Sequence, residues 1–204
     1  MSQPLASVPL LEQRAAVPHR DRVLLELIDS MPHKKVLGWD AYHSLVYFLQ
    51  RAGVDLGFSF VFHFLGPYSF GLNDYLHAME MSGAIMIAGG PNPVELTAIP
   101  MAANATGSGQ QLPDDVLGHI HRIAEALAPE EASSLELLAA VDFLVSVAKI
   151  GDEQEVIRCL GALTEGTWNA ASVSRALRFL RERLGFEAIS QDGEQHRREA
   201  DDRQ

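Results

Sequence analysis

The spacing of apolar and polar positions predicts two helices near the start of the chain. In residues 21–30 (DRVLLELIDS) apolar side chains recur with the period of one helical face, and Pro32 follows the segment. Residues 39–52 (WDAYHSLVYFLQRA) show the same spacing and stop before Gly53. The predicted buried stripe of this second helix consists of Tyr42, Leu45, Val46 and Leu49.

A different period appears in residues 58–65 (FSFVFHFL). Phenylalanine occupies every second position there, which is typical of a strand that buries one face. Gly66 and Pro67 are expected to end this strand, and Ser69 is expected to cap a third helix over residues 69–82. The inward positions of that helix are Leu72, Tyr75, Leu76 and Met79.

Two short strands are predicted next, over residues 84–88 and 94–99, with the sequence GGPNP as a hairpin turn between them. The order of these parts is the order around the reading helix of a winged-helix domain. Residues 101–113 have the composition of a linker. Four further helices are predicted over residues 114–128, 133–150, 152–163 and 171–184.

These elements predict an α+β fold that is predominantly helical, with a winged-helix-like N-terminal part and a C-terminal helical bundle. The tail carries almost only polar and charged residues, which favours disorder. The predicted divisions are a flexible leader at 1–19, a winged-helix-like domain at 20–100, the linker at 101–113, the helical bundle at 114–186 and a disordered tail at 187–204.

Composition narrows the function classes. The 204 residues are 47% hydrophobic, which is enough for a core, and the formal net charge is −11. An acidic chain is a poor general binder of nucleic acid and of anionic membranes. The start lacks the pattern of a secretory signal, and no apolar run approaches a membrane span. We therefore expect a cytoplasmic protein without a membrane role; the oligomeric state stays open.

The charge distribution argues against DNA reading by the 69–82 helix. No lysine or arginine occurs between Arg51 and Arg122. Docking on DNA depends on cationic contacts to phosphates, and base reading commonly uses arginine. Nucleic-acid binding is therefore expected only elsewhere, for which the 171–185 segment offers Arg175, Arg178 and Arg181. These arginines form either a solvated helix face or a contact for an acidic partner or a nucleic-acid backbone.

Catalytic and metal-binding patterns are lacking in the sequence. It contains no nucleophile elbow, no glycine-rich phosphate cradle after a strand and a single cysteine, Cys159. His119 and His121 are two positions apart and point away from each other on a helix. A composite site of His43, His63 and His77 is conceivable, although no spacing demands it. We expect no enzyme activity, no cofactor and no metal.

The GPYS corner is the best candidate for a specific role. In one interpretation, Tyr68 and Ser69, with His63 and Asn73 nearby, line a recognition surface beside a helix N-terminus. In the other, Gly66 and Pro67 make a turn, the serine caps the helix and the tyrosine packs. Both interpretations are compatible with each other.

The corner and its flanks also carry a resemblance. The helix ending YFLQRAGVDLGFSF, then GPYS, then Leu72, Leu76, Gly83 and Ile85 resemble the YwgA-like proteins and, more remotely, the SocA-type (Panacea-domain) antitoxin-related proteins. The resemblance covers about residues 20–100. It departs at Tyr75, where the family pattern has an acidic residue; here Asp74 lies one place earlier. The resemblance implies a binding module that acts through protein contacts.

Three functions remain as hypotheses. The first is a non-enzymatic protein-interaction module, an adaptor or antitoxin-like regulator that holds a partner protein. The second is a DNA-binding transcriptional regulator that uses a basic patch outside the 69–82 helix. The third is an acidic surface that competes with nucleic acid for a basic partner. An exposed apolar patch favours the first, a contiguous basic stripe the second and a row of carboxylates the third.

Overall fold

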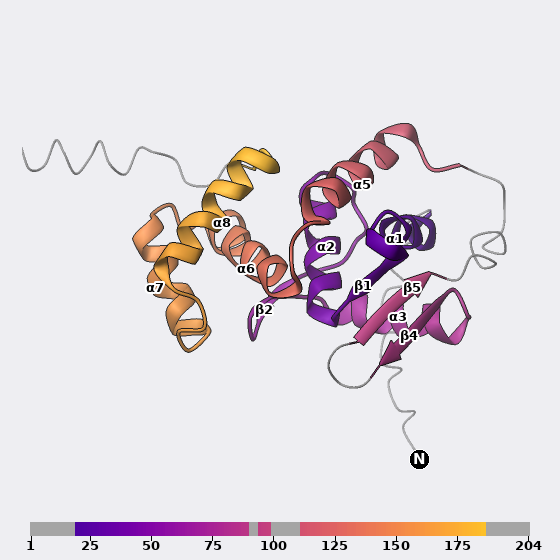
Figure 1. Cartoon of the computed structure of the whole chain (residues 1–204), viewed down its shortest axis with the longest axis horizontal. Helices are drawn as coiled ribbons and strands as arrows, with labels where there is room; N and C mark the ends of the chain where they lie inside the picture. Colours follow the sequence, from indigo (N-terminus) through magenta and orange to yellow (C-terminus); the bar gives the residue numbers. More distant parts are fainter. Residues whose placement is uncertain (1–18, 90–93, 99–110, 187–204) are drawn as a thin grey trace, which may run out of the picture.

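A computed structural model describes residues 19–89, 94–98 and 111–186. It confirms the predicted fold class, because the chain is α+β and mostly helical (Figure 1). The leader before residue 19, most of the hairpin turn (90–93), most of the linker (101–110) and the tail at 187–204 lie outside the described residues, as do residues 99 and 100, so those predictions are untested.

Helix α2 (Trp39–Arg51) lies at the centre of the molecule. All of its residues from Ala41 to Leu49 are buried, so the buried surface is wider than the predicted stripe. A helix that is buried on all sides needs neighbours on all sides. Helix α1 (Arg20–Asp29) contributes a buried apolar face of its own, and the hydroxyl of Tyr42 on α2 donates to the carbonyl oxygen of Leu24 on α1.

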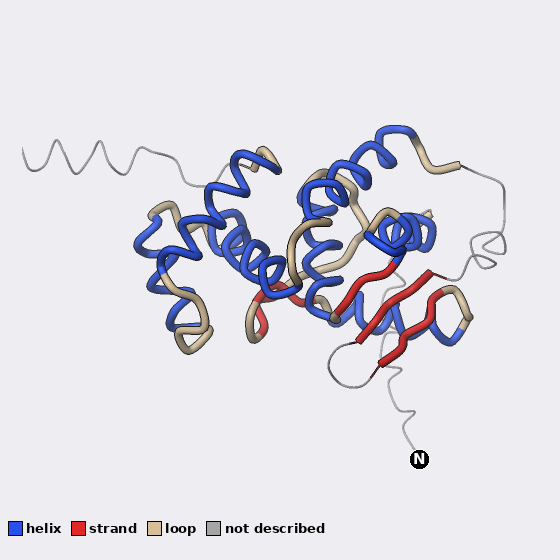
Figure 2. The backbone as a smooth tube through the Cα atoms, in the orientation of Figure 1, coloured by secondary structure: helices blue, strands red, loops and turns tan. Residues whose placement is uncertain are grey.

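A three-stranded antiparallel sheet covers one end of these helices (Figure 2). Its order is β1 (Lys35–Leu37), β5 (Val94–Ala98), β4 (Ile85–Gly89). The predicted strand pair corresponds to β4 and β5, whose register pairs Ile87 with Leu96. Strand β1, which follows a short 3-10 turn (Pro32–Lys34), was not predicted, because three residues are too few to show a period.

The predicted strand over 58–65 is wrong in extent. The structure has a two-stranded hairpin, β2 (Val61–His63) with β3 (Gly66–Tyr68), so Gly66 and Pro67 belong to the second strand. Phe58 is outside the strand because the Gln50 side chain bonds both its backbone N–H, at 3.0 Å, and its carbonyl oxygen, at 2.9 Å. The turn falls at Phe64, whose backbone has φ 47°.

Helix α3 (Phe70–Met81) follows the hairpin as predicted. The Ser69 hydroxyl accepts from the Leu72 N–H at 3.2 Å, which is the expected cap. The helix ends before Gly83, which has φ 74°. Helices α1 to α3 and the strands β1, β4 and β5 form the part that was expected to be winged-helix-like; that comparison stays a prediction.

The C-terminal half consists of α5 (Asp114–Leu127), α6 (Ala132–Asp142), α7 (Glu153–Leu163) and α8 (Ala170–Arg183). The predicted 133–150 helix is shorter, because α6 runs into a π-helical turn (Phe143–Val147) and then ends. Helix α5 packs on α1 and α2, and α6 packs on α2, β3 and α8. The two halves thus contact each other through α1, α2 and β3. The predicted domain boundaries stay a prediction.

The longest helices described, α5 and α8, have 14 residues each. A helix needs roughly 20 apolar residues to cross a bilayer. Across the described ranges, no helix is both long enough and apolar enough to span a membrane.

Candidate functional site

The turn of the β2–β3 hairpin exposes large aromatic rings. Phe64 is 79% exposed, and Phe70, in the first turn of α3, is 60% exposed. The φ of 47° at Phe64 is in the left-handed region that usually belongs to glycine in two-residue hairpin turns. A bulky residue in this conformation is uncommon and costs on the order of 1 kcal/mol. The hairpin therefore holds an apolar ring in solvent at an energetic cost.

These rings form one connected cluster. The centroid of His63 lies 4.3 Å from that of Phe64 and 5.8 Å from that of Phe70. Tyr68 and Phe70 meet edge to face at 5.1 Å. Such spacings are favourable for aromatic pairs. We call the four residues His63, Phe64, Tyr68 and Phe70 the aromatic surface.

A buried histidine packs against the inner side of the aromatic surface. His43 on α2 is fully buried and stacks on Tyr68 at 4.1 Å with an interplanar angle of 10°. Its Nδ1 accepts from the Ser69 N–H at 3.1 Å, so the neutral ring carries its proton on Nε2. Burial lowers the pKa of His43 to about 4. The neutral ring fixes the GPYS corner to α2.

Two carboxylates act electrostatically on the aromatic surface. Burial raises the pKa of Tyr68, and the charges of Asp40, in the first turn of α2, and of Asp74 on α3 raise it further. Asp74 follows Phe70 by four positions, which places both side chains on one face of α3. Burial and the charge of Asp40 raise the pKa of Glu136, on α6, to about 7.

No ion pair of the described residues joins a lysine or arginine to these carboxylates. The sequence has no lysine or arginine between Arg51 and Arg122. Among the described residues, neither the ion pairs nor the cation–π contacts involve a member of the aromatic surface. The site is thus aromatic and anionic, and its one group that can become a cation among the described contacts is His63: burial raises the pKa of Asp40, and the charge of His63 lowers it.

The structure brings some of the predicted corner residues together. Tyr68 and His63 belong to the aromatic surface. Ser69 is buried and caps α3, and the half-buried Asn73 donates its backbone N–H to the Ser69 carbonyl oxygen at 3.0 Å. Phe64 and Phe70 were missed as site residues. For Phe64 the alternating pattern indicated burial, and nothing in the sequence marks a turn at that position.

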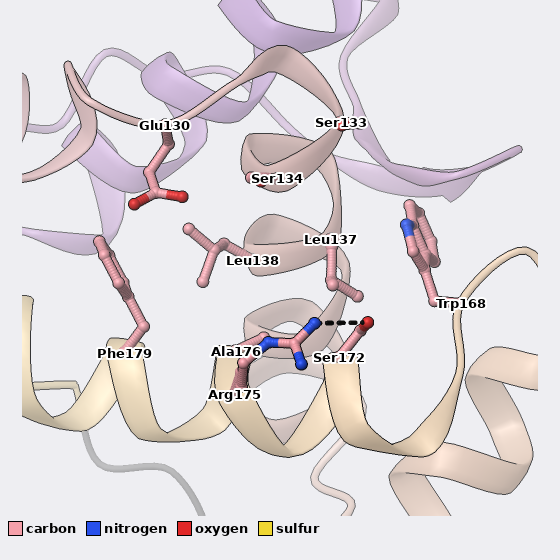
Figure 3. Close-up of a pocket in the computed structure, with 10 residues that line it drawn as sticks. All are labelled: Glu130, Ser133, Ser134, Leu137, Leu138, Trp168, Ser172, Arg175, Ala176 and Phe179. Carbon is pink, nitrogen blue, oxygen red and sulfur yellow. Dashed lines mark hydrogen bonds between the residues drawn. The ribbon is translucent and has the colours of Figure 1, made fainter.

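The predicted arginines of α8 lie elsewhere. Arg175, Arg178 and Arg181 are all exposed. Arg175 donates to the Ser172 hydroxyl at 3.0 Å and lines a groove of about 370 Å³ between α6 and α8 (Figure 3). Arg178 and Arg181 are not among the residues that line this groove.

The groove itself combines apolar and polar groups. Leu137 and Leu138 of α6 form its apolar side, and Trp168 and Phe179 stand at its two ends (Figure 3). Glu130 and Arg175 face it without forming an ion pair among the described contacts. The groove offers an apolar contact area with one charge of each sign.

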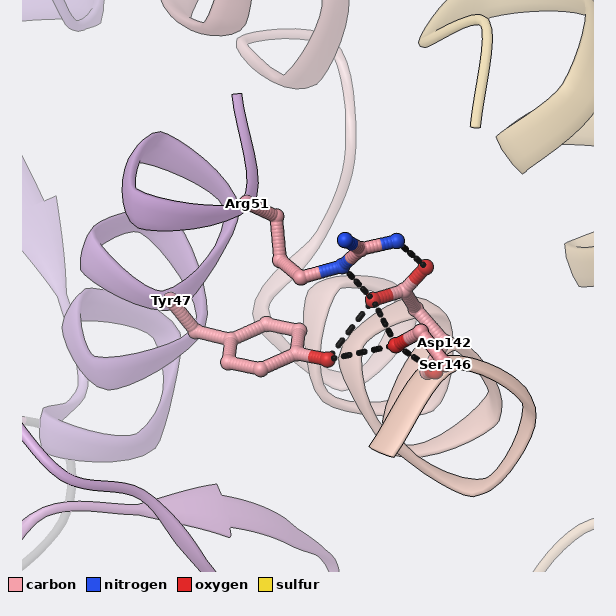
Figure 4. Close-up of polar contacts among 4 residues, drawn as sticks. All are labelled: Tyr47, Arg51, Asp142 and Ser146. Atoms are coloured by element: carbon pink, nitrogen blue, oxygen red, sulfur yellow. Dashed lines mark hydrogen bonds and ion pairs between the residues drawn. The ribbon is translucent and has the colours of Figure 1, made fainter. Parts of the chain in front are cut away.

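A buried polar cluster joins the two halves of the chain, and the sequence did not predict it. Asp142 of α6 accepts from the Tyr47 hydroxyl at 2.6 Å and from Arg51 Nε at 2.8 Å (Figure 4). Ser146 donates to the same carboxylate at 3.0 Å. The partners are 91 and 95 positions apart in sequence. The cluster fixes α2 against α6, and the hairpin contacts both helices.

The histidines do not assemble the composite site that was considered. His43 and His63 both contact Tyr68, whereas His77 lies against Trp39 at 5.4 Å. His119 pairs with Arg122, and His121 lies 3.6 Å from Glu26. In the part of the chain that the structure describes, no three His, Cys, Asp or Glu residues are placed to hold a metal ion.

The comparisons with known proteins leave the family open. The sequence matches no family model, and no curated protein matches it at a significant level. The resemblance to the YwgA-like proteins therefore stays a prediction.

Proposed function

We propose that the chain is a non-enzymatic protein-interaction module, an adaptor or antitoxin-like regulator, and that the aromatic surface holds its partner protein. The observation that carries the proposal is Phe64, which is 79% exposed on a backbone conformation that disfavours a bulky residue. Aromatic residues dominate the energetics of protein–protein contacts. An exposed ring at an energetic cost is better explained by a contact than by folding.

The buried contacts that hold the aromatic surface in place favour the same proposal. His43 fixes Tyr68 and Ser69 to α2, and α2 is fixed to α6 through Asp142. A rigid support lowers the entropy lost on binding, which raises affinity. The surface is therefore organised before a partner arrives.

The experiment is affinity purification of the tagged full-length protein from its own host, with and without nuclease. The wild type is compared with Phe64→Ser/Phe70→Ser, which removes two exposed rings. The matched control is Val147→Ser/Leu163→Ser, because these two residues are both 51% exposed and belong neither to the hairpin nor to α3. We expect one nuclease-resistant protein with the wild type and the control and none with the ring variant. Equal recovery with all three proteins would refute the proposal.

A DNA-binding regulator is the second candidate. Its support is the exposure of Arg175, Arg178 and Arg181 on one helix, of which only Arg175 has a described hydrogen bond. Cations on one helix can neutralise phosphates. Fluorescence anisotropy with a duplex, at two salt concentrations, separates the candidates. Binding that weakens with salt and is lost in Arg175→Ala/Arg178→Ala supports the regulator.

A further inference from the structure

The aromatic surface combines two features that together select a ligand. It presents the faces and edges of exposed rings, and carboxylates stand beside them. Resting on the proposed function, we infer that the aromatic surface receives an arginine side chain of the partner protein. The guanidinium stacks on Phe70, beside Tyr68, and pairs with the carboxylate of Asp74.

The geometry of α3 supplies the first argument. Phe70 and Asp74 are both exposed and lie one turn apart on the same helix face. Tyr68 meets Phe70 edge to face with an interplanar angle of 73°. Because the two rings are almost perpendicular, a planar cation can stack flat on only one of them, and the exposed ring on the helix face of Asp74 is Phe70. A planar cation can therefore stack and form an ion pair at the same time.

Charge complementarity supplies the second argument. Burial raises the pKa of Tyr68, and the negative charges of Asp40 and Asp74 add to this effect. No lysine or arginine occurs in the 70 positions between Arg51 and Arg122. The formal net charge of the chain is −11. A cationic group is drawn to such a surface, whereas a phosphate backbone is repelled. The occupant that fits is a basic protein segment.

The chain itself shows this arrangement with one of its own arginines. Arg51 lies over Phe186 at 5.0 Å and bonds Asp142. Arg20 shows the ring contact alone, since it lies over Phe58 at 4.7 Å and Tyr75 at 5.1 Å. The aromatic surface has rings and carboxylates of the same kind, and the described chain places no arginine on them.

The experiment is a titration of the full-length, 15N-labelled protein with N-acetyl-arginine amide, followed by NMR. N-acetyl-citrulline amide is the matched control, because it has nearly the same shape without the charge. We expect saturable shifts at residues 61–74 with a dissociation constant on the order of 10 mM. Asp74→Asn is expected to weaken binding about threefold. Phe64→Ser/Phe70→Ser is expected to abolish the shifts, and Val147→Ser/Leu163→Ser is expected to keep them.

Three results would overturn the inference: equal shifts with the citrulline compound, shifts centred outside residues 61–74, or no saturable shift up to 50 mM of the arginine compound, where about 80% saturation is expected. The purification experiment keeps this failure apart from a failure of the proposed function. If a partner is captured through Phe64 and Phe70 but the arginine compound does not bind, the proposed interaction module is supported and the inference of an arginine ligand is refuted. If neither works, both proposals fall.

Discussion

Replacing Asp142 by alanine tests how the two halves of the chain are held together. The Asp142 side chain is only 3% exposed and accepts hydrogen bonds from Tyr47, Arg51 and Ser146. Its removal leaves the hydroxyl of Tyr47 and the guanidinium of Arg51 without their acceptor. Because the Arg51 side chain is 32% exposed, water reaches part of it and reduces the loss.

The expected cost is about 3 kcal/mol in the free energy of unfolding. Breaking a buried ion pair costs about 3–5 kcal/mol, and we take the lower end because of the partial exposure of Arg51. Stacking of Arg51 over Phe186, at 5.0 Å, keeps the guanidinium from turning fully into solvent. Tyr47→Phe removes one hydrogen bond to a charged group and is expected to cost about 1.5–3 kcal/mol.

Urea unfolding followed by circular dichroism measures both changes. The matched control is Glu155→Ala, which breaks the exposed ion pair with Arg158, whose atoms are 3.1 Å apart. An exposed pair of this kind contributes about 0–1 kcal/mol. If Asp142→Ala costs no more than Glu155→Ala, the polar cluster does not hold the halves together and this reasoning is wrong.

Three further predictions concern the hairpin and its support. Ser69→Ala removes the cap of α3 and is expected to lower stability by about 1 kcal/mol, measured by thermal unfolding. His43 is expected to stay neutral at pH 5, with its proton on Nε2, and to show an NMR titration midpoint near pH 4. Because the pKa of His43 in the folded protein lies below the usual 6.5, the stability that the neutral ring contributes is lost as the pH falls from 6.5 to 4. The pKa of Glu136 is raised from 4.5 to about 7, so its ionisation destabilises the fold as pH rises through that window. Glu136→Gln should therefore stabilise the protein more at pH 8 than at pH 5, and an equal effect at both values would contradict this.

The helices could be predicted from the sequence because their apolar periods are long. Helices α1, α2, α3 and α5 begin and end within one or two residues of the predicted ranges. Strand β1 could not be predicted, since Lys35–Leu37 is too short for a period. The end of α6 in a π-helical turn also has no local signal, because the apolar pattern continues through Phe143–Val147.

The candidate site depends on contacts that a local pattern does not contain. The strand predicted over 58–65 begins later in the structure, because the Gln50 side chain forms hydrogen bonds with the backbone N–H and carbonyl oxygen of Phe58. The turn at Phe64 then exposes a ring that the alternation places inside. Asp142 is joined to Tyr47 across 95 positions, which no spacing rule links. By contrast, Tyr68 and His63 flank the Gly-Pro turn signal, and their ring centroids lie 5.2 Å apart; their role in a recognition surface stays a prediction.

Site-specific photocrosslinking at position 64 tests the central claim most directly. A photoreactive phenylalanine analogue replaces Phe64 in one protein and Leu163, which is exposed at the end of α7, in a second. Both proteins are irradiated in the native host and their adducts are read by mass spectrometry. The account predicts one discrete protein adduct at position 64, none at position 163, and crosslinked peptides that contain arginine. An adduct at position 163 with none at position 64 would contradict it.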